Sequence, residues 1–367
     1  MEKAFEIFSQ SFDVDYYFFS AGQEWYWARE HGVRGGNFTY EYLWGFSLGQ
    51  VRITPLLPIK LLAKDYRVYI KCINGRFALP VTYLIARLKR KPFILWTGIW
   101  MRLDTPLHRL FFFLTRWFYR HADALVVYGK HVKDYLITEG VNPAKIFIAP
   151  RAVENSFYNV SISESEKQTL RKNLSITSHQ KVVLYLGRLE ENKGLDYLIE
   201  AFASLQYRDC ILILAGSGSQ ESFLKKRIAE KNLMSQVRMP GYIPQQQTLF
   251  YYAIAWVTVL PSITTPYSKE LWGLVINEAF NQGLPAIATE AVGAAEGGLI
   301  EEGKNGFIVP ERDSNALAKA LDTILGDNRL RQKMSEDARN TIQHWTQEKM
   351  MQGFHEAVHY VEKKHHK

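Results

Sequence analysis

Short apolar runs alternate with helical patterns along most of the chain, and this alternation constrains the fold more than any other feature. Val182-Val183-Leu184-Tyr185-Leu186 is typical of a buried strand, and apolar residues at helical spacing follow it after a glycine turn. Other candidate strands lie near Ile211, Val237, Trp256 and Ala286, and at 12–20, 66–73, 92–96 and 124–128. Strands that alternate with helices favour parallel sheets with crossover helices, so the predicted fold class is α/β.

Two glutamates flank a predicted loop-to-helix junction in the second half of the chain. Gly273 marks the expected start of a helix, which places Glu270 just before the helix and Glu278 in its second turn. Eight residues at the helical rise span roughly 12 Å, which exceeds the ~5 to 9.5 Å between the paired carboxylates of glycoside hydrolases. The pair therefore suits the two ends of an extended ligand. If the pair stood alone, two solvated glutamates on a helix surface would be the better interpretation.

The segment after the predicted strand at 182–186 adds two cations. Arg188 and Lys193 lie five residues apart, between a glycine turn at Gly187 and the start of a helix. Arg binds phosphate oxygens through paired hydrogen bonds and Lys supplies a mobile point charge, while a helix start also favours phosphate. Sugar hydroxyls, a diphosphate and ribose hydroxyls would meet these groups in order. The pattern predicts a nucleotide sugar as the ligand.

These segments resemble glycosyltransferase family 4, the retaining, metal-independent enzymes of GT-B fold. The resemblance runs from about 182 to 310 and more loosely back to 91. It implies two Rossmann-like domains with parallel sheets that face a cleft. The positions that match the donor site of the family are Gly187, Arg188, Lys193, Glu270, Gly273 and Glu278. The other donor-binding residues that we expect are Tyr242, Ile243 and Leu274.

The resemblance also implies a role for each charged residue. Arg188 and Lys193 would stabilise the charge that develops on the departing diphosphate. Glu270 would hold the hydroxyls of the donor sugar, and Glu278 those of the ribose. We expect Arg188, Lys193 and Glu270 to be catalytic, and we assign no catalytic base. We expect no cofactor and no metal, because no His/Asp/Glu cluster with metal-ligand spacing is apparent in the sequence. Asp13-Val14-Asp15 imitates a metal-binding pair, but it alternates within a predicted strand, as a surface-facing pair does.

The resemblance divides the chain into three parts. Residues 1–165 would form an acceptor- and membrane-facing Rossmann-like domain, and residues 175–340 a nucleotide-sugar-binding domain. Residues 341–367 would form a terminal helix that returns to the first domain. The polar, serine-rich segment 160–178 is the expected connection between the domains.

The amino-terminal half departs from the family pattern. Members usually begin with a strand and a glycine-rich loop, whereas this sequence starts at the helix that follows them. The family commonly places a His after the strand at 93–96, where this chain has Thr97-Gly98-Ile99-Trp100. The usual Asn-Gly-Val-Asp segment is replaced by Arg151-Ala152-Val153-Glu154. These differences concern the acceptor and the identity of the sugar more than donor binding.

The charge distribution indicates a polyanionic neighbour for the first half. Residues 51–150 hold 17 Lys plus Arg against 5 Asp plus Glu. The segment 106–120 mixes arginines with Phe, Trp and Tyr, and a helix of this composition suits an anionic membrane surface. A core-packed helix with solvated arginines explains the segment equally well. Two cysteines and no signal peptide or spanning run predict a cytoplasmic protein, peripheral on the inner face of the membrane.

The expected function is transfer of a sugar from a nucleotide diphosphate sugar to a glycan or lipid-linked acceptor, in polysaccharide or glycolipid biosynthesis. One alternative is a sugar-nucleotide epimerase of the same fold, although its acid/base carboxylates and histidine are not evident. Another is a catalytically impaired membrane-bound scaffold of transferase descent, although the four donor-site charges are retained. Nucleic-acid binding is not expected, because no recognised module accompanies the basic region.

Overall fold

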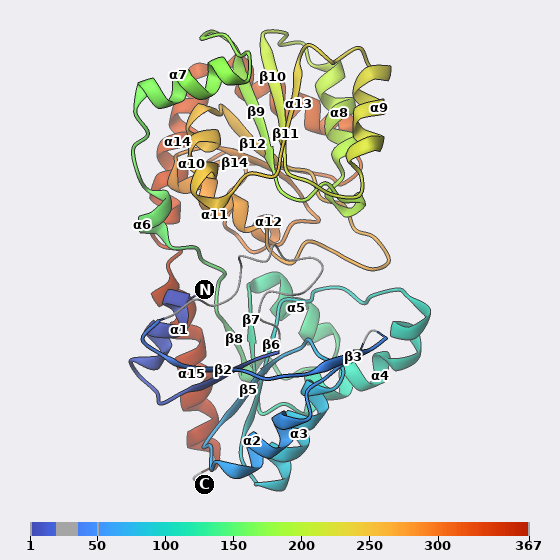
Figure 1. Ribbon diagram of the computed structural model, residues 1–367, viewed down its shortest axis with the longest axis vertical. Helices are drawn as coiled ribbons and strands as arrows, with labels where there is room; N and C mark the ends of the chain where they lie inside the picture. The colour runs from blue at the N-terminus through green and yellow to red at the C-terminus, as the bar shows by residue number, and fades with distance from the viewer. Residues whose placement is uncertain (1, 20–35, 50, 366–367) are drawn as a thin grey trace.

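The computed structural model describes residues 2–19, 36–49 and 51–365. Figure 1 shows two α/β halves stacked along the long axis of the molecule, with the second half of the chain above the first. Each half is built on a parallel sheet with helices on both of its faces. The predicted α/β architecture with two parallel sheets is confirmed.

The second half contains a six-stranded sheet in the order β11-β10-β9-β12-β13-β14. Every pairing in it is parallel. The central strands are continuous apolar runs because both of their faces are covered. The strands are β9 (Lys181–Leu186), β10 (Cys210–Ala215), β11 (Val237–Gly241), β12 (Val257–Leu260), β13 (Ala286–Thr289) and β14 (Gly306–Val309).

Alternate residues of β9 separate the two faces of this sheet. Val183 and Tyr185 belong to the core under one group of helices, and Val182 and Leu184 to the core under another. The first group contains α8 (Leu195–Ser204), α9 (Glu221–Glu230) and α13 (Ser314–Gly326). The second contains α6 (Asn155–Tyr158), α7 (Glu164–Asn173) and α10 (Gln245–Ile254). The remaining helices of this half are α11 (Leu274–Asn281), α12 (Gly293–Glu296), α14 (Asn328–Ile342) and the short η2 (Glu191–Lys193).

The first half contains a four-stranded parallel sheet in the order β5-β6-β7-β8. Its strands are β5 (Tyr69–Cys72), β6 (Phe93–Thr97), β7 (Ala124–Val127) and β8 (Ile146–Ile148). The helices α2 (Leu56–Ala63), α3 (Ala78–Leu88), α4 (Pro106–His121) and α5 (Lys130–Thr138) accompany it, with the short η1 (Pro143–Lys145). Two smaller sheets complete this half: β1 (Asp15–Phe18) with β2 (Thr39–Tyr42), and β3 (Phe46–Leu48) with β4 (Val51–Ile53).

The last helix of the chain covers the first half. α15 (Gln347–His365) places Met350, Phe354 and Val358 against Ile94 and Val126 of the four-stranded sheet. α1 (Glu2–Ser9) packs beside α15 on the same face. The chain therefore starts and ends on the first half, as Figure 1 shows.

The strands near 182, 211, 237, 256 and 286 and those within 12–20, 66–73, 92–96 and 124–128 are all present in the structure. The segment 160–178 differs from a plain connection, because a Ser163 capping box starts α7 there and α7 packs on α10. Its polar composition belongs to a surface helix. The chain passes between the halves earlier: Ala152 packs with α15, and Tyr158 packs in the second half.

Candidate functional site

The predicted donor residues gather at the carboxyl ends of the six-stranded sheet. β9 and β12 are neighbours in this sheet, although two strands separate them in the sequence, so the strand order reverses between them. Parallel α/β sheets bind ligands outside such a switch point. Arg188 and Lys193 follow β9, Tyr242 and Ile243 follow β11, and Glu270 follows β12.

Two glycine loops pack against each other beside the switch point. The Leu189 N–H donates to Ser217 O at 2.9 Å, and the Gln220 N–H donates to Leu189 O at 2.9 Å. Gly216 has a φ of +145°, and a Cβ there would lie 1.8 Å from the carbonyl oxygen of Gly187. Only glycine allows this approach, which fixes the backbone next to Arg188.

A salt bridge joins the loops that follow β9 and β12. Lys193 Nζ donates to Glu270 Oε2, and the two side chains are only 13% and 16% exposed. Ser262 Oγ donates to the same carboxylate at 3.3 Å. The Ile263 N–H donates to Asn192 O, and Gly194 lies so close to Pro261 that a Cβ would meet its carbonyl oxygen at 2.1 Å. Two charges that are far apart in the sequence are thus held as one unit.

Helix α11 carries the second glutamate. Gly273 is its N-cap residue with φ +95°, and a Cβ at this position would lie 2.5 Å from the Leu260 side chain. The first N–H groups of a helix lack partners within the helix, so those at Leu274 and Val275 suit an anion. Glu278 lies in the second turn and Glu270 before the helix, as the sequence predicts.

Glu278 lies in an environment that the sequence did not reveal. Tyr252 Oη donates a hydrogen bond of 2.7 Å to Glu278 Oε2. Burial raises the pKa of Glu278 to about 7, against a smaller lowering by hydrogen bonds from Tyr252 and Tyr158. The carboxyl group of Glu278 therefore changes between its protonated and ionised forms near neutral pH.

Arg188 and Tyr242 are the exposed members of the predicted set. Tyr185 Oη donates to Arg188 O at 2.5 Å and so anchors the backbone, while Arg188 as a whole is exposed. Among the residues that the structure describes, Arg188 makes no salt bridge, in contrast to Lys193. Tyr242 is 52% exposed and Ile243 is half-buried. Arg188 is therefore free to meet an anionic ligand.

The first half contacts the donor loop through Trp100. Its Nε1 donates to Glu270 O at 3.0 Å, and Lys269 Nζ lies 3.6 Å from the centre of its ring. Trp100 falls in the segment 97–100, where the family commonly has a His. The His131 ring lies 4.8 Å from that of Trp100, and burial lowers the pKa of His131 to about 4, so this ring is neutral at neutral pH.

The sequence pattern did not identify Trp100, Asn192, Tyr252 or Ser262. The first three contact residues that are distant in the chain, and Ser262 contacts Glu270 across a loop. Trp100 was noted only as part of the segment that lacks a His. A local sequence pattern does not show which residues of different loops contact each other in the fold.

Two family models match successive parts of the chain. Residues 10–157 match the model described as Glycosyltransferase Family 4, and residues 166–341 match that of Glycosyl transferases group 1. The chain is 27% identical to an alpha-D-kanosaminyltransferase of Streptomyces kanamyceticus, over 74% of this chain and 71% of that protein. It is 32% identical to an amylovoran biosynthesis glycosyltransferase of Erwinia amylovora, over 51% of this chain and 43% of that protein.

Solved structures share the arrangement of the two halves. The Anabaena protein HepE, solved in complex with UDP, superposes with a TM-score of 0.72 at 22% identity, covering 88% of this chain and 86% of that one. The sucrose-phosphate synthase of Thermosynechococcus elongatus superposes with a TM-score of 0.75 at 19% identity, covering 99% and 92%. At these identities the likeness concerns the fold. With the two family models, it shows that the chain belongs to glycosyltransferase family 4 and has the GT-B fold of these enzymes.

Proposed function

We propose that the protein is a retaining glycosyltransferase that moves a sugar from a nucleotide diphosphate sugar to a lipid-linked glycan acceptor. The observation that carries the donor part is the Lys193–Glu270 salt bridge at the switch point. Exposed Arg188 lies in the same loop as Lys193, and Glu270 precedes the amino end of α11 by three residues. HepE, a structural neighbour, has been solved with UDP-glucose, which supports a donor of this class.

Each part of a nucleotide sugar has a residue of matching chemistry in this arrangement. Arg188 and the first N–H groups of α11 would bind the diphosphate, and Lys193 would move from Glu270 towards it as charge develops on the leaving group. Glu270 would then accept hydrogen bonds from the sugar hydroxyls. Glu278, with Tyr252 behind it, would accept from the ribose hydroxyls. These residues supply electrostatic stabilisation, so the proposed reaction uses no metal and no other cofactor.

A donor screen tests this proposal. Purified protein would be incubated with UDP-, GDP- and ADP-linked sugars, and release of free nucleoside diphosphate would be measured with and without EDTA. We expect release from one donor class and no effect of EDTA. A loss in EDTA that Mg²⁺ or Mn²⁺ restores would contradict the metal-free mechanism, and release from no donor would favour a scaffold of transferase descent.

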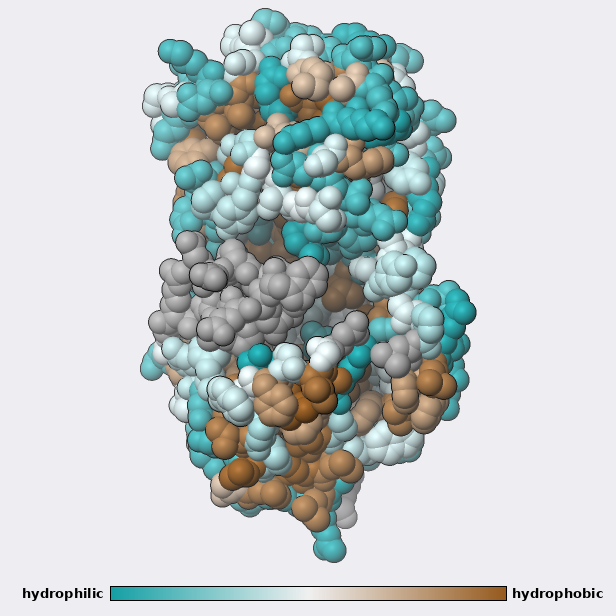
Figure 2. Space-filling view, turned by 45° about the vertical axis from the view of Figure 1, so that its right-hand side comes forward, coloured by the Kyte–Doolittle hydropathy of each residue, from teal (hydrophilic) through white to brown (hydrophobic). Residues whose placement is uncertain are grey.

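The acceptor part rests on an exposed apolar surface of the first half. Figure 2 shows apolar side chains gathered over this half, whereas the second half is mostly hydrophilic. α2 packs on α3, and Tyr83 of α3 packs against Trp117 of α4 at 5.0 Å, so the three helices form one surface. Its exposed apolar residues are Leu56, Ile59, Leu62, Leu84, Leu88, Leu110, Phe111, Phe113, Leu114 and Trp117.

This surface suits the interfacial region of a membrane. No helix among the described residues is long and apolar enough to cross a bilayer. The arginines of α4 have protein partners: Arg109 pairs with Asp104, Arg116 with Glu139, and Arg120 donates to Glu139 O. Apolar insertion therefore contributes more to the proposed attachment than attraction of these arginines to lipid phosphates.

Vesicle binding by variants separates the contribution of apolar insertion from that of electrostatic attraction to anionic lipids. Leu110→Glu with Phe113→Glu should abolish binding to vesicles of phosphatidylcholine and phosphatidylglycerol, because both side chains are more than 60% exposed on α4. Replacing Lys89, Arg90 and Lys91 by glutamate should weaken binding mainly at low salt. Lys225→Glu with Lys226→Glu, on α9 of the other half, is the control. Unchanged binding by the Leu110/Phe113 variant would contradict the proposed membrane surface.

A further inference from the structure

The carbonyl group of Glu270 accepts hydrogen bonds from both halves of the molecule. Within the second half, the Gly293 N–H donates to Glu270 O at 3.1 Å, next to a β-bridge between Glu270 and Val292. From the first half, Trp100 Nε1 donates to the same oxygen at 3.0 Å. Because a carbonyl oxygen has two lone pairs, both are used here. The backbone that carries the Glu270 carboxylate is therefore fixed with respect to both halves.

Trp100 is itself held by the first half. It follows β6 by three residues, in a segment where the Ile99 N–H donates to Oγ1 of the buried Thr97 at 3.2 Å. Its ring packs on the core that the four-stranded sheet shares with α2 and α3. The ring of His131, at the start of α5, lies 4.8 Å away and nearly perpendicular, at 84°. The first half therefore sets the direction of the indole N–H.

The first half also contacts the neighbours of Glu270 in the chain. Lys269 Nζ lies 3.6 Å from the centre of the Trp100 ring, a distance at which the face of an indole attracts a cation. The His131 ring lies 6.0 Å from the ring of Trp272. The donor loop, residues 269–273, is thus contacted from the ends of β6 and β7 on both sides of Glu270.

The Glu270 carboxylate depends on this backbone if the reaction proceeds as proposed. In the structure, the carboxylate accepts hydrogen bonds from Lys193 and, at 3.3 Å, from Ser262. Lys193 is the partner that would leave for the diphosphate. The direction of the carboxylate then depends mainly on the position of the Glu270 backbone. A misplacement of about 1 Å at a reacting centre costs as much as about 10²-fold in rate, so a second hydrogen bond to this backbone matters.

We propose that Trp100 is a positioning residue for sugar transfer, whose indole N–H holds Glu270 where its carboxylate meets the donor sugar. This inference rests on the proposed function and adds a residue of the first half to it. The nucleoside diphosphate would bind to groups of the second half alone, namely Arg188, Lys193, the start of α11 and Glu278. Trp100 should therefore affect the transfer step and leave nucleotide binding unchanged. A residue that only packed between the halves would show no such selectivity.

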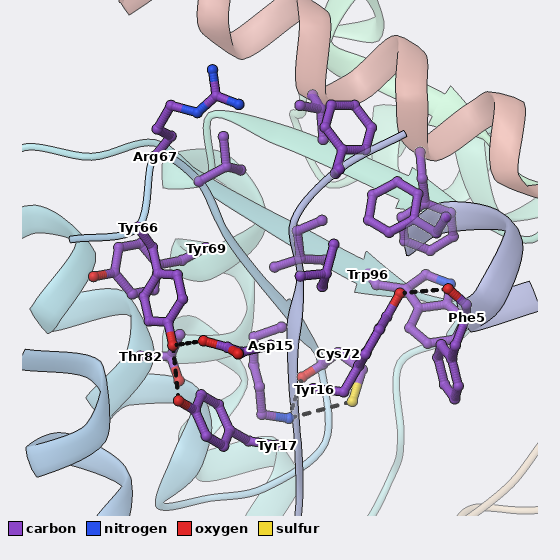
Figure 3. Close-up of a pocket in the computed structure, with 18 of the residues that line it drawn as sticks. Phe5, Asp15, Tyr16, Tyr17, Tyr66, Arg67, Tyr69, Cys72, Thr82 and Trp96 are labelled. Atoms are coloured by element: carbon purple, nitrogen blue, oxygen red, sulfur yellow. Dashed lines mark hydrogen bonds between the residues drawn. The ribbon is translucent and has the colours of Figure 1, made fainter. Parts of the chain in front are cut away.

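The test variant is Trp100→Phe, which keeps an aromatic ring beside Lys269 and loses the indole N–H. Trp96→Phe is the matched control, because it is the same substitution in the same half, within β6. Trp96 lines the cavity of Figure 3, whose described lining includes no residue of the donor loop. Among the described residues, no group accepts a hydrogen bond from Trp96 Nε1. The control thus removes an indole N–H that positions nothing in the site.

Steady-state release of nucleoside diphosphate, from the donor that the screen identifies, gives kcat and KM for each protein. Calorimetric titration gives the Kd of the free nucleoside diphosphate, and Tm confirms that each variant is folded. We expect Trp100→Phe to lower kcat about 10- to 100-fold with KM and Kd unchanged, the mark of an interaction made in the transition state. Trp96→Phe should keep the wild-type kcat. An unchanged kcat in folded Trp100→Phe, or a Kd weakened as much as kcat, would overturn the proposal.

Hydrogen exchange of the ligand-free proteins gives a readout that needs no turnover. Exchange at the Gly293 N–H and at 269–272 should be faster in Trp100→Phe than in the wild type, and unchanged in Trp96→Phe. Equal exchange in the two variants would overturn the proposal even if the wild type transfers sugar. Release of nucleoside diphosphate from no donor by the wild type would instead contradict the proposed function, and the role of Trp100 in transfer with it.

Discussion

At the scale of single residues, the candidate site combines the Lys193–Glu270 charge pair with Arg188, which makes no salt bridge to any residue in the part of the chain that the structure describes. Lys193 and Glu270 form an ion pair whose side chains are mostly buried, whereas Arg188 is exposed. An ion pair of this kind keeps a lysine in place without a ligand and allows it to change partner when a diphosphate arrives. The sequence predicted these residues and their order, but the direct pairing of Lys193 with Glu270 became visible only in the fold.

Arg188→Ala should lower kcat for donor turnover by about 10²- to 10³-fold, because a preorganised donor to the leaving group is lost. The variant should fold normally, since the guanidinium is exposed. Steady-state release of nucleoside diphosphate measures this effect, with Lys226→Ala on α9 as the control for loss of a surface cation. Normal turnover by a folded Arg188→Ala protein would remove Arg188 from the donor site.

Glu278→Gln should change stability in a pH-dependent way. The pKa of Glu278 is raised from 4.5 to about 7, so the folded state favours the protonated carboxyl group. The stability that this proton contributes is fully present below pH ~4.5 and is lost as pH rises through ~7. A neutral glutamine should therefore stabilise the protein at pH 8.5, by up to about 3 kcal/mol, and have little effect at pH 4.5.

Thermal unfolding of the wild type and Glu278→Gln at both pH values measures this difference. Glu336→Gln, at an exposed position of α14, serves as the control. An equal shift in Tm at pH 4.5 and pH 8.5 would show that ionisation of Glu278 is not coupled to folding.

At the scale of elements, the site depends on glycine loops between strands and helices. The strands were predictable because covered parallel strands are continuous apolar runs, and the helices because of their apolar spacing. The loop contacts were not, because the carbonyl of Gly187 that faces Gly216 is 29 residues away in the chain. The short strands β2, β3 and β4 also escaped prediction, since Glu41, Ser47 and Arg52 interrupt their apolar residues.

Gly216→Ala should destabilise the protein and weaken donor binding together. Its Cβ would overlap the carbonyl oxygen of Gly187, and the residue would keep a φ of +145° that alanine disfavours, at a cost of about 1–3 kcal/mol from strain alone. Gly326→Ala at the end of α13 is the matched control, because a Cβ there has open space. Chemical denaturation of both variants checks the difference. Equal stabilities would show that the approach of the two loops is not required.

At the scale of the whole molecule, the two halves meet at the donor loop. Trp100 donates to Glu270 O, Asp104 N donates to Pro266 O, and Asn277 Nδ2 donates to Arg151 O. The resemblance predicted two α/β domains that face each other, but which residues bridge them depends on their orientation, which no local pattern encodes. We propose that the acceptor approaches the donor sugar from the first half, which carries Trp100 and the apolar surface of α2, α3 and α4.

We propose that a nucleoside diphosphate binds where the strand order of the six-stranded sheet reverses, between β9 and β12. Hydrogen exchange of the wild-type protein, with and without the nucleoside diphosphate that the donor screen identifies, tests it most directly. We expect slower exchange at 187–194, after β9, and at 270–278, around the start of α11, with no change at β1 or β5. Protection confined to the first half, or none at saturating nucleotide, would contradict it.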